Sequence, residues 1–146
     1  MTAIKCNSVD SVSEINLSGH QLNGTLAEFS FVLFPNLNYF NLSYNSFTGL
    51  IPPDNENLTE LQHLDFSSNK LTGAIPDQVS HLQKLRTLNL SDNHLEAPNW
   101  STFSPMPSLT NLCLNNNNLS SKFPDFISNC HNLTYLDLSL NMLTGD

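Results

Sequence analysis

The sequence has 146 residues, the length of one ordinary domain, with five Lys and Arg against thirteen Asp and Glu. The few basic residues are scattered and form no positive stripe, which disfavours nucleic acid and anionic membrane surfaces as partners. Charged residues make up only 12%, against roughly 25% in soluble domains, and Leu and Asn are abundant, which argues against a disordered chain.

Targeting and anchoring signals are missing from the sequence as written. No apolar run approaches the ~18 residues of a membrane span, and the N-terminal residues lack the basic start and apolar block of a signal peptide. Three cysteines, Cys6, Cys113 and Cys130, are too few for a disulfide scaffold. We therefore expect no direct membrane insertion by this segment.

A repeat of 24 residues organises the chain. Its units begin at Leu37, Leu61, Leu85, Leu109 and Leu133, and an earlier unit begins at Val12. The predicted units are residues 12–36, 37–60, 61–84, 85–108, 109–132 and an incomplete 133–146. The second to sixth units open with L-x-x-L-x-L-x-x-N-x-L or its Phe variant, which is the leucine-rich-repeat pattern.

The first half of each unit predicts a strand, because side chains alternate between the two faces of an extended segment. Leu64 and Phe66, for example, point inward together. In the second half, apolar residues three apart indicate a short helix or 3₁₀ turn on the convex side. Because one coil cannot bury its own apolar face, the coils must stack. We expect an α/β solenoid, a right-handed superhelix with a concave parallel β-sheet.

One polar residue recurs in the turn that follows each strand. The column consists of Asn45, Asn69, Asn93, Asn117 and Asn141. Asparagine amides can bond backbone groups of the bend and of the next coil. The column therefore predicts a buried ladder that satisfies otherwise costly polar groups.

The segment after the Asn turn, as in Leu71–Thr72–Gly73–Ala74–Ile75–Pro76, resembles the plant-specific class of leucine-rich repeats. That class builds the ectodomains of plant receptor-like kinases, receptor-like proteins and cell-wall inhibitors. The stretch VSEINLSGHQLNGTLAEFSF followed by FPNLNYFNLSYNSFTG resembles the group of male-discoverer-interacting receptor-like kinases. The resemblance covers residues 12–146 and implies that residues 1–11 are the remnant of an N-terminal cap, with Cys6 separated from its usual partner.

The chain also departs from the family pattern. The fourth unit has Glu96–Ala97–Pro98–Asn99–Trp100 where Gly and Ile-Pro are usual, and no C-terminal cap, membrane helix or kinase domain follows Asp146. We interpret the sequence as a fragment of a longer product. Receptors of this class that hold the C-terminal carboxylate of a peptide resemble one another in an Arg-x-Arg pair on the concave strands. This sequence contains no Arg-x-Arg.

The outward residues of the concave strands are the candidate ligand-binding surface, because solenoids present their sheet to partners. The candidates are Tyr39, Tyr44, His63, Asp65, Thr87, Asn111, Tyr135 and Asp137. The first four combine aromatic rings with a carboxylate, a mixture favoured in binding hot spots. The alternative is that all eight are ordinary solvated sheet surface.

Sequons for N-glycosylation are dense. They begin at Asn16, Asn23, Asn41, Asn57, Asn89, Asn99, Asn118 and Asn132. Some arise from the repeat itself, and glycans would help to keep a surface with few charges soluble.

Catalytic chemistry is not indicated. The five histidines show no spacing typical of a zinc site, His63 and Asp65 lack a nucleophile with an oxyanion-hole turn, and there is no phosphate-binding loop. Cys130 continues an apolar column and is expected to be a buried thiol. We expect no catalytic residue, no metal and no cofactor.

The main functional hypothesis is a recognition module of a plant cell-surface receptor, which binds a peptide, elicitor or co-receptor on its concave face. Family resemblance implies the extracellular face of the plasma membrane or the apoplast. One alternative is a secreted inhibitor or decoy of a microbial enzyme, which would use the same face. A third is a non-functional remnant, because uncapped ends expose core leucines and strand edges.

Overall fold

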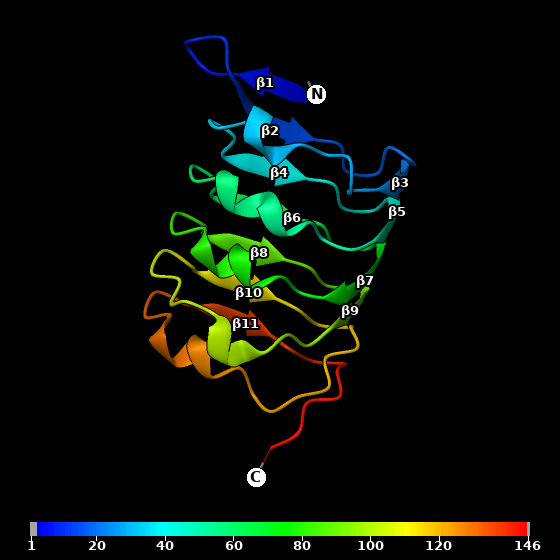
Figure 1. The fold of residues 1–146 in the computed structure, drawn as a ribbon, viewed down its shortest axis with the longest axis vertical. Coiled ribbons are helices and arrows are strands. Elements are labelled where there is room, and N and C mark those ends of the chain that lie inside the picture. Colours follow the sequence, from blue (N-terminus) through cyan, green and yellow to red (C-terminus); the bar gives the residue numbers. More distant parts are fainter. Residues whose placement is uncertain (1–2, 146) are drawn as a thin grey trace.

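The computed structural model describes residues 3–145, except the side chains of residues 55 and 56. The chain winds through successive coils that stack along one axis, and its two termini lie at opposite ends of the stack (Figure 1). This is the predicted leucine-rich-repeat solenoid. Of the predicted cap 1–11, residues 1 and 2 lie outside the described part.

The concave sheet has the strand order β1-β2-β4-β6-β8-β10-β11. Its strands are β1 (Ile4–Cys6), β2 (Val12–Asn16), β4 (Tyr39–Asn41), β6 (His63–Asp65), β8 (Thr87–Asn89), β10 (Asn111–Cys113) and β11 (Tyr135–Asp137). β1 runs antiparallel to β2, and all other pairs are parallel with each residue opposite its counterpart in the next unit. Because the repeats have nearly equal length, residues at equivalent positions of successive units lie side by side in the sheet.

A second sheet lies along the side of the stack, in the order β3-β5-β7-β9 (Figure 1). It consists of β3 (Asn23–Thr25), β5 (Ser46–Gly49), β7 (Lys70–Ala74) and β9 (His94–Glu96). The sequence indicated extended pieces here but not that they pair. Gly49 and Gly73, both paired within this sheet, have φ of +77° and +75°, a conformation that glycine adopts at little steric cost.

The convex side carries short helices, all of the 3₁₀ type in the described part. They are η1 (Phe31–Leu33), η2 (Pro53–Asn57), η3 (Asp77–His81), η4 (Trp100–Thr102) and η5 (Asp125–Asn129). The sequence predicted either a short helix or a 3₁₀ turn on this side, and the structure has 3₁₀ helices. A 3₁₀ helix fits because the apolar residues recur every three positions, which matches its three residues per turn.

The second sheet ends in the fourth unit, which lacks Gly and Ile-Pro. β9 ends at Glu96, which makes a single bridge to Asn118 and no further strand pair. Trp100 takes the buried position instead: its ring lies against Phe103 and Phe126, and its Nε1 donates to Ser121 Oγ at 2.9 Å.

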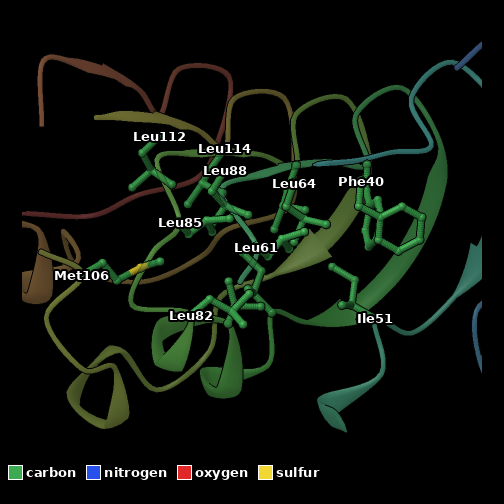
Figure 2. Packing of buried hydrophobic residues seen from close by; sticks show 14 of the residues in the cluster. Phe40, Ile51, Leu61, Leu64, Leu82, Leu85, Leu88, Met106, Leu112 and Leu114 are labelled. Atoms are coloured by element: carbon green, nitrogen blue, oxygen red, sulfur yellow. The ribbon is translucent and has the colours of Figure 1, made fainter. Parts of the chain in front are cut away.

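The core is one continuous column of apolar side chains between the concave sheet and the helices. Leu64, Leu88 and Leu112 follow one another from coil to coil, and Leu82 and Met106 face them from the helical side (Figure 2). All five are at most 2% exposed. Cys130 is buried in the same column, as expected, whereas Cys113 is half-buried and Cys6 exposed.

The predicted asparagine ladder is present, and its middle members are buried. Asn93 Nδ2 donates to Leu90 O and Ser91 O of its own turn and to Phe66 O of the preceding coil, at 3.0–3.2 Å. Its Oδ1 accepts from Leu71 N at 3.0 Å, also in the preceding coil. The direction predicted from the sequence was wrong: these bonds reach back to the preceding coil and not forward to the next.

The same arrangement recurs along the ladder. Asn69 and Asn117 are buried, and Asn45 and Asn141 are half-buried near the two ends. Each Oδ1 accepts a backbone N–H 22 or 23 residues earlier in the chain. Each amide thus supplies polar partners to two coils at once, and the three central amides do so where they are buried from water.

Replacing Asn93 by Ala tests the ladder. The substitution leaves one buried N–H and up to three carbonyls without their side-chain partner, so we expect a loss of about 3 kcal/mol in the free energy of unfolding. Denaturant unfolding followed by circular dichroism measures it. The control is Asn129→Ala on the exposed convex side; equal effects of the two substitutions would contradict a special role of the ladder.

Candidate ligand-binding surface

The outward side chains of the concave strands form two columns across the sheet. The first runs through Tyr39, His63, Thr87, Asn111 and Tyr135, which pair directly from strand to strand. The second runs through Asn41, Asp65, Asn89, Cys113 and Asp137 in the same register. The structure thus brings seven of the eight predicted site residues onto one face; the eighth, Tyr44, lies in the turn that follows β4.

Tyr39 and His63 form the one aromatic stack on this face among residues 3–145. Their ring centroids are 4.3 Å apart and the ring planes are inclined by 5°. Directly opposite residues of parallel strands approach closely enough for such contact. The two rings therefore pack face to face and form one half-buried aromatic platform across β4 and β6.

His63 has an unsatisfied polar atom. Its Nε2 is buried and has no hydrogen-bond partner within the described residues. Burial lowers the pKa of the imidazole below its ordinary value, and the nearby Asp65 carboxylate offsets only part of that effect. At neutral pH the ring is therefore uncharged and keeps one nitrogen able to accept a hydrogen bond.

The second column is mainly engaged in holding the turns. Asp65 Oδ1 accepts from the backbone N and the hydroxyl of Ser67, at 2.9 and 2.6 Å, and Oδ2 accepts from Asn89 Nδ2 at 3.3 Å. Asp137 accepts the same two bonds from Ser139, which lower the pKa of its carboxyl. Such Asx turns hold the chain where it leaves the strand. These carboxylates therefore have a structural role, whereas the sequence pattern indicated only that they face outward.

Cys113 interrupts this series of turns. Burial raises the pKa of its thiol, and the carboxylates of Asp137 and Asp65 raise it further. A thiol held protonated in this way is a poor nucleophile and a poor metal ligand.

The eight sequons divide into two structural groups. Asn16, Asn41 and Asn89 lie on the concave sheet, where they are half-buried; Asn23, Asn57, Asn99, Asn118 and Asn132 are exposed elsewhere. In the concave group the Asn and Ser of the triplet bond each other, as in Asn89 Oδ1 with Ser91 Oγ at 2.7 Å. Asp65 and Ser67 make the same bonds without being a sequon. The triplets on this face thus have a structural explanation of their own.

Two surface hollows lie away from the concave face. One, of about 600 Å³, runs beside the second sheet and is lined by Thr25, Gly49, Leu50 and Pro52 among others. The other, of about 460 Å³, is lined by residues that include Arg86, Thr110 and Asn132. Neither hollow was predicted from the sequence. The signal for the first was Leu50, the variable position of the Gly-x-Ile-Pro segment, which is 63% exposed.

Within residues 3–145, no three His, Cys, Asp or Glu side chains are grouped so that they could hold a metal ion. None of the helices in this part of the chain is long and apolar enough to cross a bilayer.

The comparisons with known proteins all point to repeats of this kind. The Leucine rich repeat family matches residues 35–95 and 85–143. Over 50 residues the chain is 42% identical to a probable leucine-rich repeat receptor-like protein kinase of Arabidopsis thaliana, a match that covers 34% of this chain and 4% of that relative. The chain therefore spans only a small part of that kinase.

Two solved structures show the same architecture. The plant peptide hormone receptor RGFR1, in complex with RGF2, is 35% identical with a TM-score of 0.83; the match covers 90% of this chain and 21% of that one. The ectodomain of BIR2 from Arabidopsis thaliana is 29% identical with a TM-score of 0.84, covering 99% and 76%.

The relatives are plant receptor kinases, as the resemblance implied, while the finer likeness to the male-discoverer-interacting group stays a prediction. Because the family pattern matches well over half of its residues, the chain belongs to the leucine-rich repeat family.

Proposed function

We propose that this chain is a recognition module of a plant cell-surface receptor, and that its concave face binds a peptide. The similar structure RGFR1 is described as a peptide hormone receptor in complex with RGF2. On this proposal the chain acts outside the cell and makes or breaks no bond. Ligand binding shifts the receptor between states through differential affinity.

The observation that carries the proposal is the platform of Tyr39 and His63. A buried ring nitrogen without a partner costs free energy, and a ligand reaches Nε2 only if the His63 ring turns outward, a movement that no hydrogen bond of Nε2 opposes. The stacked rings add a rigid aromatic pair, and aromatic side chains are enriched in hot spots. Thr87 and Asn111 continue the column with groups that can bond a peptide backbone.

The proposal also gives roles to Tyr135, to the exposed sequons and to a co-receptor. Tyr135 lies at the far end of the first column and is 50% exposed, so it can contact the far end of an extended ligand. The exposed sequons Asn57, Asn99 and Asn132 would carry glycans on the sides that the ligand does not use. A co-receptor ectodomain remains a second class of partner for the same protein.

Substitution of the platform tests the proposal. Peptides are selected from a phage-displayed library of random dodecamers against the folded chain, and their affinities are measured by calorimetry. Tyr39→Ala and His63→Ala should each weaken binding at least about tenfold, because each removes a central ring contact.

The matched control is His131→Ala, which removes an exposed histidine away from the concave strands and should change affinity less than about twofold. Equal affinities of all three variants and the unaltered chain would show that peptides bind elsewhere.

Binding should also depend on pH through His63. The neutral imidazole accepts a hydrogen bond and the protonated one cannot. Because its pKa lies below the usual value of about 6.5, affinity should be constant above neutral pH. It should fall as the pH drops through the lowered pKa of the folded chain.

His63→Gln keeps a hydrogen-bonding side chain but does not titrate, so its affinity should stay level over the same range. Calorimetric titrations between about pH 7.5 and about pH 5 compare the two. A fall of equal size in both proteins would exclude His63 as the titrating group.

A further inference from the structure

Every turn that follows a parallel strand of the concave sheet has left-handed backbone at one equivalent position, and the first of these turns has a second such residue, Gln21 (56°). The equivalent residues and their φ angles are Gly19 (67°), Tyr44 (54°), Ser68 (53°), Asp92 (54°), Asn116 (54°) and Leu140 (53°). They stand at the same place in each unit, directly before the ladder asparagine in all units that have one. The conformation is therefore a property of the coil and not of the individual residue.

The stacking of the coils explains why the conformation is needed. The N–H of this residue donates to a backbone carbonyl of the following coil: Tyr44 N to Ser67 O at 3.0 Å, and Ser68 N to Ser91 O at 3.0 Å. Asp92 and Asn116 make the same bond at 3.0 and 2.9 Å. A residue that could not adopt positive φ would turn its N–H away and lose one coil-to-coil bond.

Residue type at this position is normally matched to the conformation. Glycine tolerates positive φ, and the short polar side chains of Asn and Asp are several-fold enriched there. Tyrosine is not favoured, because its Cβ meets the neighbouring carbonyl without a local hydrogen bond in return. Tyr44 is thus a locally unfavourable choice at a site where four of the other five residues are Gly, Ser, Asp or Asn.

Nothing inside the molecule compensates for this choice. The side chain of Tyr44 is 69% exposed. Within residues 3–145, no aromatic ring stacks on it and its hydroxyl has no hydrogen bond. Leu140 departs from the preference in the same way, but it belongs to the last coil and its N–H makes no such coil-to-coil bond within the described residues. An exposed aromatic held in an unfavourable backbone conformation is typical of a functional contact.

We infer that Tyr44, in the turn that borders the concave face after β4, is a specificity-determining contact, and that it takes a basic side chain of the bound peptide. This rests on the proposed function. The chain has a net charge of −8, Asp65 lies in β6 of the next coil, and Asp92 holds the position equivalent to Tyr44 two coils later. The exposed phenol ring offers its face to a Lys or Arg head group as a cation–π contact, in a field that attracts cations.

The test combines stability and binding in one substitution. Tyr44→Asp introduces the residue that the fourth coil has at this position, so the backbone conflict is removed and the melting temperature should rise by about 2–4 °C. Binding of the library-selected dodecapeptides should weaken at least about tenfold, although the added negative charge attracts basic peptides. The selected peptides should be enriched in Lys and Arg.

Ser68→Asp is the matched control, because it adds the same charge at the same position one coil later. It should leave affinity within about twofold of the unaltered chain. A melting temperature of Tyr44→Asp at or below that of the unaltered chain would overturn the inference, and so would unchanged peptide affinity.

The two proposals fail differently. Peptides that lose affinity on His63→Ala but not on Tyr44→Asp would overturn the role of Tyr44 alone. Selected peptides without enrichment in Lys and Arg would overturn its preference for a basic side chain. Peptides indifferent to both substitutions, or a library that yields no binder, would contradict the concave-face proposal as well.

Discussion

The hydrogen bonds that join one coil to the next determine nearly everything else in this molecule. Short strands of three to five residues cannot stand alone, and the buried asparagines connect each turn to the coil before it. Because the same bonds recur in every unit, equivalent positions align across the sheet. A binding surface then follows from the stack itself: whatever varies at the outward positions is displayed in straight columns.

The repeat predicted most of the fold because each inward position has a single physical requirement. Leucine at the strand positions and asparagine in the turn leave few alternatives, and both were recognisable in the sequence. The second sheet was not predicted, because its strands include Gly49 and Gly73 in a positive-φ conformation that only the coordinates show. The predicted direction of the asparagine bonds was wrong for the same reason. A recurring asparagine in the sequence does not indicate whether its side chain bonds the preceding or the following coil.

The candidate surface was predicted less completely than the fold. Alternation identified which side chains face outward, but not which of them are already occupied by local bonds. Asp65 and Asp137 resembled free carboxylates, whereas the Ser two residues later in each case binds them. The Asn-Leu-Ser and Asp-x-Ser triplets contained that information, although in the sequence the former were interpreted only as sequons. Conversely, the unpartnered nitrogen of His63 could not be predicted, because it depends on the neighbouring coil.

The most direct test of the account is to map the bound peptide by amide chemical shifts in the ¹⁵N-labelled chain. We predict that a selected peptide shifts the backbone signals of β4 and β6, around Tyr39 and His63, and leaves those of η3 and η5 on the convex side unchanged. Shifts confined to the convex helices, or to the hollow beside Leu50, would contradict the claim that the stacked concave strands are the recognition surface.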